Sequence, residues 1–311
     1  MIVTKCPLRI SLAGGSTDLQ DFIDCYGMGS VINFPVNLYT YITLSSDVLG
    51  YNKIFGKHII NYTKREEEEK IENIKNDIAR EVLKYFNCEP IICTFCSDIL
   101  SSGSGLASSS SYTLSLVKAV SKFKKIQLSD SEVCKISLEI EKNFNKHTGY
   151  QDIYGCGIGS LKRIDFRKDE DPKFTYLSQK IFNNVNMYLL FTDVTRSSTR
   201  LLSKLDLEKR KPLLHLVDLL EVAIRENNKV DFFDIINEGW AKKKETSPLM
   251  TSEGRVGEID SRLSKDENVL AHRLCGAGSG GFFLTFTKYK ARDKRFIPIS
   301  ISEEGLRDIN I

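Results

Sequence analysis

Serine and glycine dominate residues 101–111, and this stretch constrains the chain most because it stands between a predicted strand and a predicted helix. The apolar run at residues 91–96 indicates the strand, and the apolar spacing at residues 112–123 indicates the helix. Glycines permit positive φ and close backbone approach, so successive N–H groups can converge on one anion. The N-terminus of the following helix adds the positive end of its dipole. We therefore favour a polyphosphate-binding loop over a flexible linker.

This loop matches neither of two common nucleotide-binding motifs. No G-x-x-x-x-G-K-[ST] sequence occurs in the chain, which excludes a Walker A loop. Residues 276–281, Gly-Ala-Gly-Ser-Gly-Gly, do match the letters of the dinucleotide fingerprint G-x-G-x-x-G. That fingerprint follows a strand and opens a helix, whereas residues 268–274 are predicted to be helical and residues 282–286 to form a strand. We therefore interpret this cluster as a glycine-rich helix-to-strand turn.

The composition excludes several other classes of protein. The 311 residues include 44 Lys and Arg against 41 Asp and Glu, a balance that argues against a nucleic-acid partner. No apolar run approaches the ~18 residues of a membrane-spanning helix, and the first residues lack the apolar core of a signal peptide. Without such a signal, the eight cysteines are expected to be free thiols. We expect a cytoplasmic protein without a membrane partner.

Hydrophobic periodicity predicts further elements along the chain. Strands are expected at residues 2–12, 31–44, 161–166 and 187–191, and helices at residues 64–86, 130–146 and 207–227. The acidic run at residues 66–69 is interpreted as the solvated start of the first helix, where carboxylates also suit the dipole.

Three acidic residues and one arginine are candidates for chemistry. Asp152 lies beside a glycine-containing break, where it could be a base, a metal ligand or a turn former. Glu141, eleven residues earlier on a predicted helix, offers a second carboxylate for a site holding Mg²⁺. Near the N-terminus, Arg9 stands on a predicted strand and Asp18 on the turn that follows it.

Taken together, these segments resemble the GHMP kinase superfamily, named for its galactokinase, homoserine, mevalonate and phosphomevalonate kinase members. Three signature motifs stand in the order of that superfamily, at residues 7–18, 103–111 and 276–281. Within it, the resemblance is to the kinases of D-glycero-D-manno-heptose 7-phosphate. The segments that carry this finer resemblance are residues 7–18, 149–155, 195–198 and 238–244.

The resemblance implies an α+β architecture, the GHMP kinase fold. Residues 1–180 would form an N-terminal ATP-binding domain like ribosomal protein S5 domain 2. Residues 181–311 would form a ferredoxin-like C-terminal domain. ATP would lie between the two domains, with its phosphates over the loop at residues 103–111.

The resemblance also assigns roles to individual residues. Asp152 would be the catalytic carboxylate with Arg9 beside it, and Ser109 and Glu141 would bind Mg²⁺. The residues expected to bind ATP are Ser102, Gly103, Ser104, Gly105, Leu106, Ala107, Ser108, Ser109 and Ser110. Those expected to bind the acceptor sugar are Asp18, Gly15, Ser16, Thr17, Gly278 and Ser279, while Arg196 and Arg200 would hold its phosphate, with Lys243 or Lys244 as weaker candidates.

The chain departs from the superfamily pattern at two positions. Ala107 replaces the usual glycine of Gly-Leu-Gly-Ser-Ser, and Ser279 interrupts the usual glycine run of the third motif. If residue 107 needs a positive φ, alanine is strained there, which would affect ATP binding.

The reaction implied is ATP-dependent phosphorylation of the anomeric hydroxyl of D-glycero-D-manno-heptose 7-phosphate. The 1,7-bisphosphate produced would feed nucleotide-activated heptose and surface polysaccharide synthesis. ATP and a phosphorylated sugar are the expected small-molecule partners, and a homodimer is left open. Two alternatives remain: another sugar 1-kinase of the fucose or galactose type, and a non-catalytic sensor that binds sugar and ATP.

Overall fold

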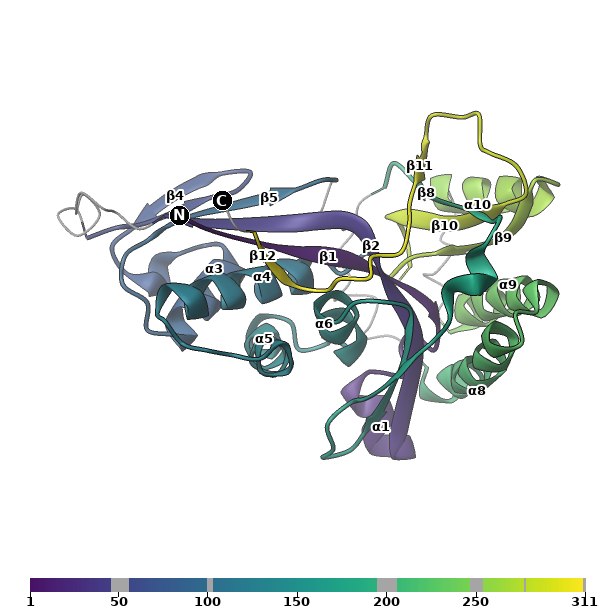
Figure 1. The fold of residues 1–311 in the computed structure, drawn as a ribbon, viewed down its shortest axis with the longest axis horizontal. Coiled ribbons are helices and arrows are strands. Elements are labelled where there is room, and N and C mark those ends of the chain that lie inside the picture. Colours follow the sequence, from purple (N-terminus) through teal and green to yellow (C-terminus); the bar gives the residue numbers. More distant parts are fainter. Residues whose placement is uncertain (46–55, 100–102, 195–205, 247–253, 277, 310–311) are drawn as a thin grey trace.

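A computed structural model describes residues 1–45, 56–99, 103–194, 206–246, 254–276 and 278–309. Within them the strands form two sheets, one of eight strands and one of four (Figure 1). The larger sheet has the order β12-β1-β2-β5-β3-β4, and β6 and β7 extend it beside β2. The smaller sheet has the order β11-β8-β10-β9. The structure thus combines α-helices with two mainly antiparallel sheets, which confirms the predicted α+β class.

Two long antiparallel strands, β1 (Ile2–Ala13) and β2 (Met28–Ser45), form the centre of the larger sheet. The short helix α1 (Gln20–Tyr26) lies between them in sequence. The pairing of β1 with β2 shifts register between Pro7 and Arg9, and again between Ser11 and Ala13. Such irregularities redirect side chains, and Arg9 lies at one of them. The sheet is completed by β3 (His58–Asn61), β4 (Arg65–Glu68), β5 (Ile92–Ser97), β6 (Lys162–Arg167) and β7 (Lys173–Tyr176).

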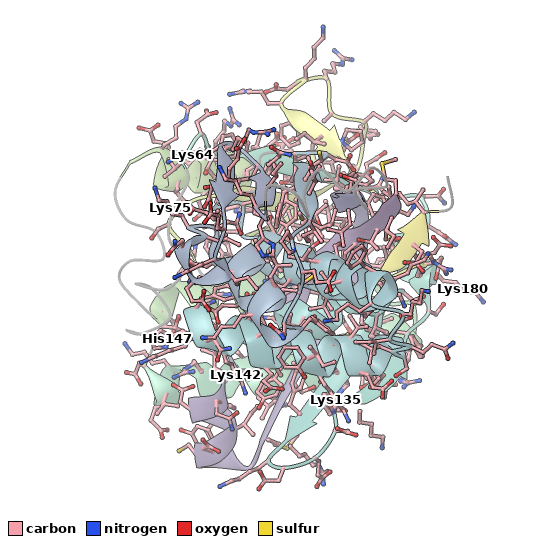
Figure 2. All side chains as sticks on the ribbon, turned by 90° about the vertical axis from the view of Figure 1, so that its left-hand side faces the viewer. Lys64, Lys75, Lys135, Lys142, His147 and Lys180 are labelled. Carbon is pink, nitrogen blue, oxygen red and sulfur yellow. The ribbon has the colours of Figure 1, made fainter. Side chains whose placement is uncertain are left out.

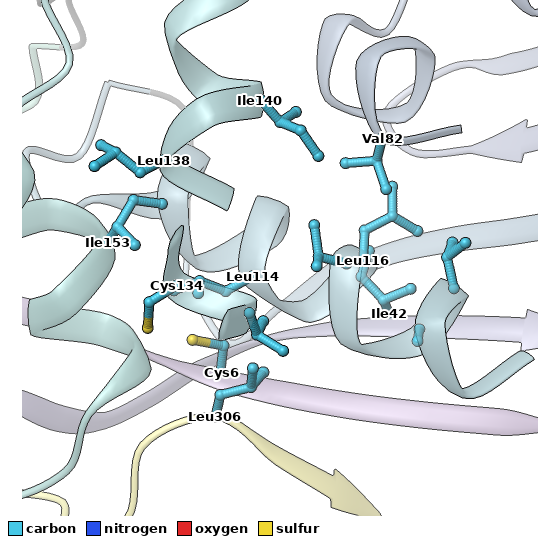
Figure 3. Packing of buried hydrophobic residues seen from close by; sticks show 14 of the residues in the cluster. Cys6, Ile42, Val82, Leu114, Leu116, Cys134, Leu138, Ile140, Ile153 and Leu306 are labelled. Atoms are coloured by element: carbon cyan, nitrogen blue, oxygen red, sulfur yellow. The ribbon is translucent and has the colours of Figure 1, made fainter. Parts of the chain in front are cut away.

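Four helices cover one face of this sheet (Figure 1). They are α3 (Asp77–Tyr85), α4 (Ser108–Phe123), α5 (Asp130–Phe144) and α6 (Tyr150–Gly157). Their apolar side chains meet those of the sheet in one core, where Leu114, Ile140 and Ile153 are fully buried (Figure 3). Each such side chain contributes roughly 1.5–3 kcal/mol by leaving water. This core fixes the starts of α4 and α6 against β1.

The smaller sheet consists of β8 (Asn186–Phe191), β9 (Val269–Leu274), β10 (Phe282–Thr287) and β11 (Phe296–Pro298). The helices α8 (Leu207–Arg225), α9 (Lys229–Glu245) and α10 (Arg255–Lys265) accompany it, and the turn η2 (Gln179–Phe182) precedes β8. A second core joins the two sheets, because Leu12 of β1 and Phe34 of β2 pack in one cluster with Val217 of α8 and Leu284 of β10.

The C-terminal strand β12 (Arg307–Ile309) returns to the larger sheet and pairs with β1, with Val3 opposite Ile309. Residues 307–309 therefore share a sheet with the first strand of the chain. The predicted division of the chain near residue 180 stays a prediction.

One predicted helix is wrong over its first half, and a second is wrong throughout. The segment predicted as one helix at residues 64–86 instead forms β4, the short turn η1 (Ile71–Asn73) and α3. Because β4 pairs with β3, alternation turns Glu66 inward, where it accepts hydrogen bonds from the amides of Lys75 at 2.6 Å and Asn76 at 3.1 Å. Glu66 is therefore a buried acceptor and not part of a solvated helix start.

The other wrong helix is the one predicted at residues 268–274, which is the strand β9 paired with β10. A segment this short does not distinguish a strand from a helix by its hydrophobic pattern, and the pairing with β10 makes it a strand. The glycine cluster that follows thus connects two antiparallel strands. The dinucleotide fingerprint remains excluded, since β10, a strand, follows the cluster.

Candidate active site

A cleft opens where elements distant in sequence converge. The residues lining it come from β1 and the turn after it, the loop at residues 103–107 and the start of α4. Others come from the end of α5, residues 145–149, the start of α6, and from α9 and β9. Three cations line this cleft, Arg9, Lys243 and Arg273, together with the carboxylates of Asp18, Glu141 and Asp152.

Arg9 and Asp152 form the central ion pair of the cleft. Arg9 Nε and Nη2 both donate to Oδ1 of Asp152, at 3.0 and 2.5 Å. Arg9 Nη1 also donates to the carbonyl of Gly105 at 3.0 Å, so one guanidinium connects the carboxylate with the Ser/Gly loop. Burial alone would lower the pKa of Arg9, but the Asp152 carboxylate raises it above its ordinary value. Arg9 is 4% exposed and Asp152 29% exposed, so the carboxylate faces the open cleft.

Asp18 holds the start of α6, the helix that carries Asp152 in its first turn. Its Oδ2 accepts from the amide of Gln151 at 3.0 Å, and its Oδ1 accepts from the Ser16 amide at 3.0 Å and the Gln151 side chain at 3.1 Å. Burial raises the pKa of Asp18 to about 6, and the charge of Asp152 adds to this effect. A Cβ at Gly149 would lie 2.2 Å from Asp18 Oδ2, so only glycine allows this contact.

The Ser/Gly loop packs directly against the third glycine motif. A Cβ at Gly105 would lie 2.5 Å from the carbonyl of Cys275, and one at Gly281 would lie 2.3 Å from the carbonyl of Ser104. Glycine at both positions therefore lets the two backbones touch. Ala107, the residue before α4, has φ 62° and ψ 39°. The predicted strain at this alanine is confirmed, and a left-handed non-glycine residue costs about 1 kcal/mol.

Glu141 is a buried carboxylate surrounded by hydroxyl groups. The Ser110 hydroxyl donates to its Oε2 at 2.6 Å, and the Ser109 and Thr148 hydroxyls lie near enough to act on its pKa. Burial raises the pKa of Glu141 to about 7, and the charge of Asp152 acts in the same direction. Carboxylate and hydroxyl oxygens suit Mg²⁺, which commonly takes one or two carboxylates and completes its shell with phosphate oxygens and water. Across the described ranges, no group of three or more His, Cys, Asp or Glu side chains could hold a metal unaided.

Basic residues divide into those in the cleft and those on the surface. Lys243 is buried in the cleft and donates to the carbonyl of Gly276 at 2.9 Å. Lys244 turns away from it and pairs with Asp260 at 3.0 Å. Lys135 and Lys180, labelled in Figure 2, are exposed and do not line the cleft. The cations in the cleft are thus buried, whereas these surface lysines are exposed.

The structure brings most of the predicted site residues to this cleft. Those that line it are Arg9, Ser16, Asp18, Gly103, Ser104, Gly105, Ala107, Ser108, Ser109, Ser110, Glu141 and Asp152. Gly15 lies beside Lys243, whereas Leu106 packs in the second core and the Thr17 hydroxyl bonds to backbone carbonyls of Gly14 and Ser30. Gly278 and Ser279 lie in the β9–β10 loop, and Ser102, Arg196 and Arg200 lie outside the described residues.

Several residues that line the cleft are not among the predicted site residues, and three of them bear on its geometry. Gln151 fixes Asp18, and half-buried His147 lies at the edge of the cleft, where Figure 2 shows it pointing outward. Arg273 was missed because it stands in the segment predicted as a helix. Alternation along a strand in that segment would have placed Arg273 on the same side as Ala271.

Residues 72–160 match the profile of the GHMP kinases N terminal domain. D-glycero-alpha-D-manno-heptose 7-phosphate kinase of Campylobacter jejuni is 27% identical over 308 residues, which cover 92% of this chain and 89% of the relative. The chain therefore resembles the GHMP kinase superfamily, with the match to its N-terminal domain at residues 72–160. Among solved structures, a D-glycero-D-manno-heptose 1-phosphate kinase from Bacteroides thetaiotaomicron superposes on this chain with a TM-score of 0.75 at 20% identity, covering 100% of this chain and 99% of the other. A galactose complex of Lactococcus lactis galactokinase superposes with the same score at 15% identity, over 99% and 95% of the two chains.

These comparisons confirm the predicted GHMP kinase fold and the predicted class of enzyme, an ATP-dependent carbohydrate kinase. The family uses ATP as its phosphoryl donor. None of the described helices is long and apolar enough to span a bilayer.

Proposed function

We propose that this chain transfers the γ-phosphoryl group of ATP to the anomeric hydroxyl of D-glycero-D-manno-heptose 7-phosphate. The product is the 1,7-bisphosphate, which would supply nucleotide-activated heptose for surface polysaccharide. The observation that carries the proposal is the Arg9–Asp152 pair facing a cleft formed by the Ser/Gly loop and the start of α6. The similarity to a heptose 7-phosphate kinase along most of both chains supports the acceptor.

Asp152 is the proposed acceptor of the hydroxyl proton. Both bonds from Arg9 go to its Oδ1, and within the described part of the chain Oδ2 has no hydrogen-bond partner. Oδ2 is thus available to a sugar hydroxyl in the cleft. Arg9 holds the carboxylate in place and offers positive charge close to the transferred group.

Phosphoryl transfer depends mostly on positioning and on neutralising charge. The loop at residues 103–107 and the amides at the start of α4 would hold the phosphates of ATP. Ser109 and Glu141 would hold Mg²⁺, which supplies charge neutralisation at the phosphates when bound. Glu141, buried among hydroxyls, fits that role because a cation would compensate its charge.

The acceptor is proposed to lie beside Asp18 and Ser16, with Gly15, Thr17, Gly278 and Ser279 around it. Gln151 and the Ser16 amide orient the Asp18 carboxylate toward this region. Arg196 and Arg200 remain our candidates for the phosphate of the acceptor, because a guanidinium can make two parallel bonds to phosphate.

The test is an ADP-release assay with D-glycero-D-manno-heptose 7-phosphate, the free heptose, galactose and fucose as acceptors. Turnover with the heptose phosphate alone, with ³¹P NMR showing a new anomeric phosphate, would support the proposal. Faster turnover with free galactose or fucose would establish the hexose 1-kinase alternative. ATP hydrolysis that no sugar stimulates would revive the sensor alternative.

We place the reaction in the cytoplasm, where ATP is available and where all eight cysteines, which are free thiols in the structure, would remain reduced. The homodimer left open by the sequence stays a prediction, which light scattering on the purified chain would test.

A further inference from the structure

Arg273 is a buried cation that lines the cleft. It stands on β9 between Ala271 and Cys275, and both of these pack in the core that contains Ile10 and Leu12 of β1. Alternation along β9 therefore turns Arg273 toward β1, where its Nη1 donates to the carbonyl of Leu12. The residue is 3% exposed, and its Nε is buried without a hydrogen-bond partner.

Other buried cations of the chain have compensating partners. Arg9 pairs with Asp152, and Arg210 pairs with Asp21 at 2.7 Å. Lys162 donates to three backbone carbonyls at 2.6–3.4 Å. Arg273 differs, because no carboxylate within the ranges that the structure describes forms an ion pair with it. A buried charge without a partner is unfavourable unless a ligand supplies the opposite charge.

The electrostatics of the cleft favour an anionic ligand. Burial lowers the pKa of Arg273 to about 10, and the nearby guanidinium of Arg9 acts in the same direction. Arg273 nevertheless keeps its proton at neutral pH. Two guanidinium groups thus stand near each other, and the single carboxylate of Asp152 is bonded to Arg9 alone. Arg273 therefore keeps a positive charge that no bonded carboxylate neutralises within the described residues.

We infer that Arg273 binds the phosphate being transferred, as a second guanidinium beside Arg9. This inference rests on the proposed function for the identity of the ligand, a nucleoside triphosphate. The phosphate already on the acceptor is the poorer candidate. In a 7-phosphate that group lies at the far end of the sugar from the anomeric hydroxyl. Arg273 lies near Arg9, which is bonded to the proposed base Asp152.

Arg273 keeps its proton throughout the reaction. The bond between the γ-phosphorus and the bridging oxygen of ADP breaks, and ADP leaves with the electron pair. The sugar oxygen forms the new bond to that phosphorus, and its proton passes to Asp152. The guanidinium donates hydrogen bonds to phosphoryl oxygens while their charge redistributes.

The test compares Arg273→Met and Arg273→Lys with the wild-type chain in two measurements. Without ligand, Arg273→Met is expected to raise Tm by about 3 °C, because it removes an unpartnered buried charge while nearly keeping the volume. Arg210→Met is the matched control, and its Tm should fall because Asp21 and the Ser16 carbonyl lose their partner. A fall in Tm for Arg273→Met as large as that of the control would show a structural role and overturn the inference.

The second measurement is the Tm shift produced by inorganic tripolyphosphate, followed by ADP release. The wild-type chain should be stabilised by tripolyphosphate, Arg273→Met should lose that shift, and Arg273→Lys should keep part of it. Turnover of Arg273→Met should fall about 100-fold. No shift in the wild type, or an equal shift in both proteins, would overturn the inference. Because tripolyphosphate contains no sugar, this result stands even if heptose 7-phosphate proves not to be the acceptor.

Discussion

Arg210 of α8 donates a hydrogen bond to the carbonyl of Ser16 at 3.2 Å and so connects a helix beside the smaller sheet with the turn that carries Asp18. Ser16 has φ 84°, a left-handed conformation that is costly for serine. Its carbonyl bonds to Arg210 and its amide to Asp18, so contacts on both sides hold the strained residue. Asp21 in turn holds Arg210, with bonds at 2.7 and 3.0 Å.

Arg210→Lys should therefore weaken binding of the acceptor sugar more than binding of ATP. Lysine cannot bond to Asp21 and the Ser16 carbonyl with one planar group. We expect KM for the sugar to rise about 10-fold, since 1.4 kcal/mol of lost positioning corresponds to that factor, and KM for ATP to change less than 2-fold. Arg225→Lys is the control on the same helix, because Arg225 is exposed and pairs only with Glu221 among the described residues. Equal increases in both KM values would indicate a general loss of structure.

Asp152→Asn should abolish most phosphoryl transfer while leaving ATP binding intact. The amide retains the shape of the side chain but cannot accept the hydroxyl proton. We expect kcat to fall by ~10³, within the range for loss of a general base, and calorimetry to show a Kd for ATP within 3-fold of the wild type. Near-normal turnover would remove Asp152 from the mechanism.

Ala107→Gly should stabilise the chain and improve ATP binding. Glycine accepts φ 62° without strain, so the free energy of unfolding should rise by about 0.5–1 kcal/mol and KM for ATP should fall. Lys125→Gly is a matched control, since Lys125 has φ 58° and is exposed beyond the other end of α4. Both variants should gain stability, but only Ala107→Gly should change KM for ATP. A loss of stability in Ala107→Gly would contradict the inference that the positive φ of Ala107 strains the backbone.

The ligand-free chain should lose stability as the pH rises from 4.5 to 7 because of Glu141. The folded chain keeps the proton of Glu141 up to a pKa of about 7, whereas the unfolded chain releases it near 4.5. The folded state thus binds more protons in this window, and the free energy of unfolding falls by about 1 kcal/mol per pH unit from this group. Urea titrations of Glu141→Gln should lack this component.

Glu139→Gln, an exposed position on the same helix, is the control for that measurement and should behave like the wild type. The same protonation predicts that Mg²⁺ affinity increases with pH up to about 7, because the metal must displace the proton. Identical pH profiles for the wild type and Glu141→Gln would show that Glu141 titrates normally.

Arg196→Ala should raise KM for a phosphorylated sugar far more than KM for ATP, because the loss of a bidentate contact affects only the ligand that makes it. A free sugar offers the comparison, since its KM should stay unchanged. An increase for ATP as large as that for the sugar phosphate would assign Arg196 another role.

The sequence predicted those parts of the site that depend on local motifs. The turn carrying Asp18, the loop before α4 and the α6 segment with Asp152 each contain a recognisable pattern, and even the positive φ of Ala107 could be anticipated. Arg273 could not, because a segment as short as Val269–Leu274 fits a strand or a helix until its pairing partner is known. The role of Arg210 could not be predicted either, because its contact with Ser16 joins residues 194 positions apart, which local sequence patterns do not reveal.

The position of β12 has a consequence for synthesis of the chain. Val3 of β1 is made first, yet its outer neighbour Ile309 follows about 300 residues later. At a translation rate of roughly 5–20 residues per second, this edge of β1 stays open for about 15–60 seconds on the ribosome. An unpaired strand edge can recruit other chains, so the nascent chain should be most prone to association just before residues 307–309 emerge. Its dependence on chaperones should therefore fall once these residues can pair with β1.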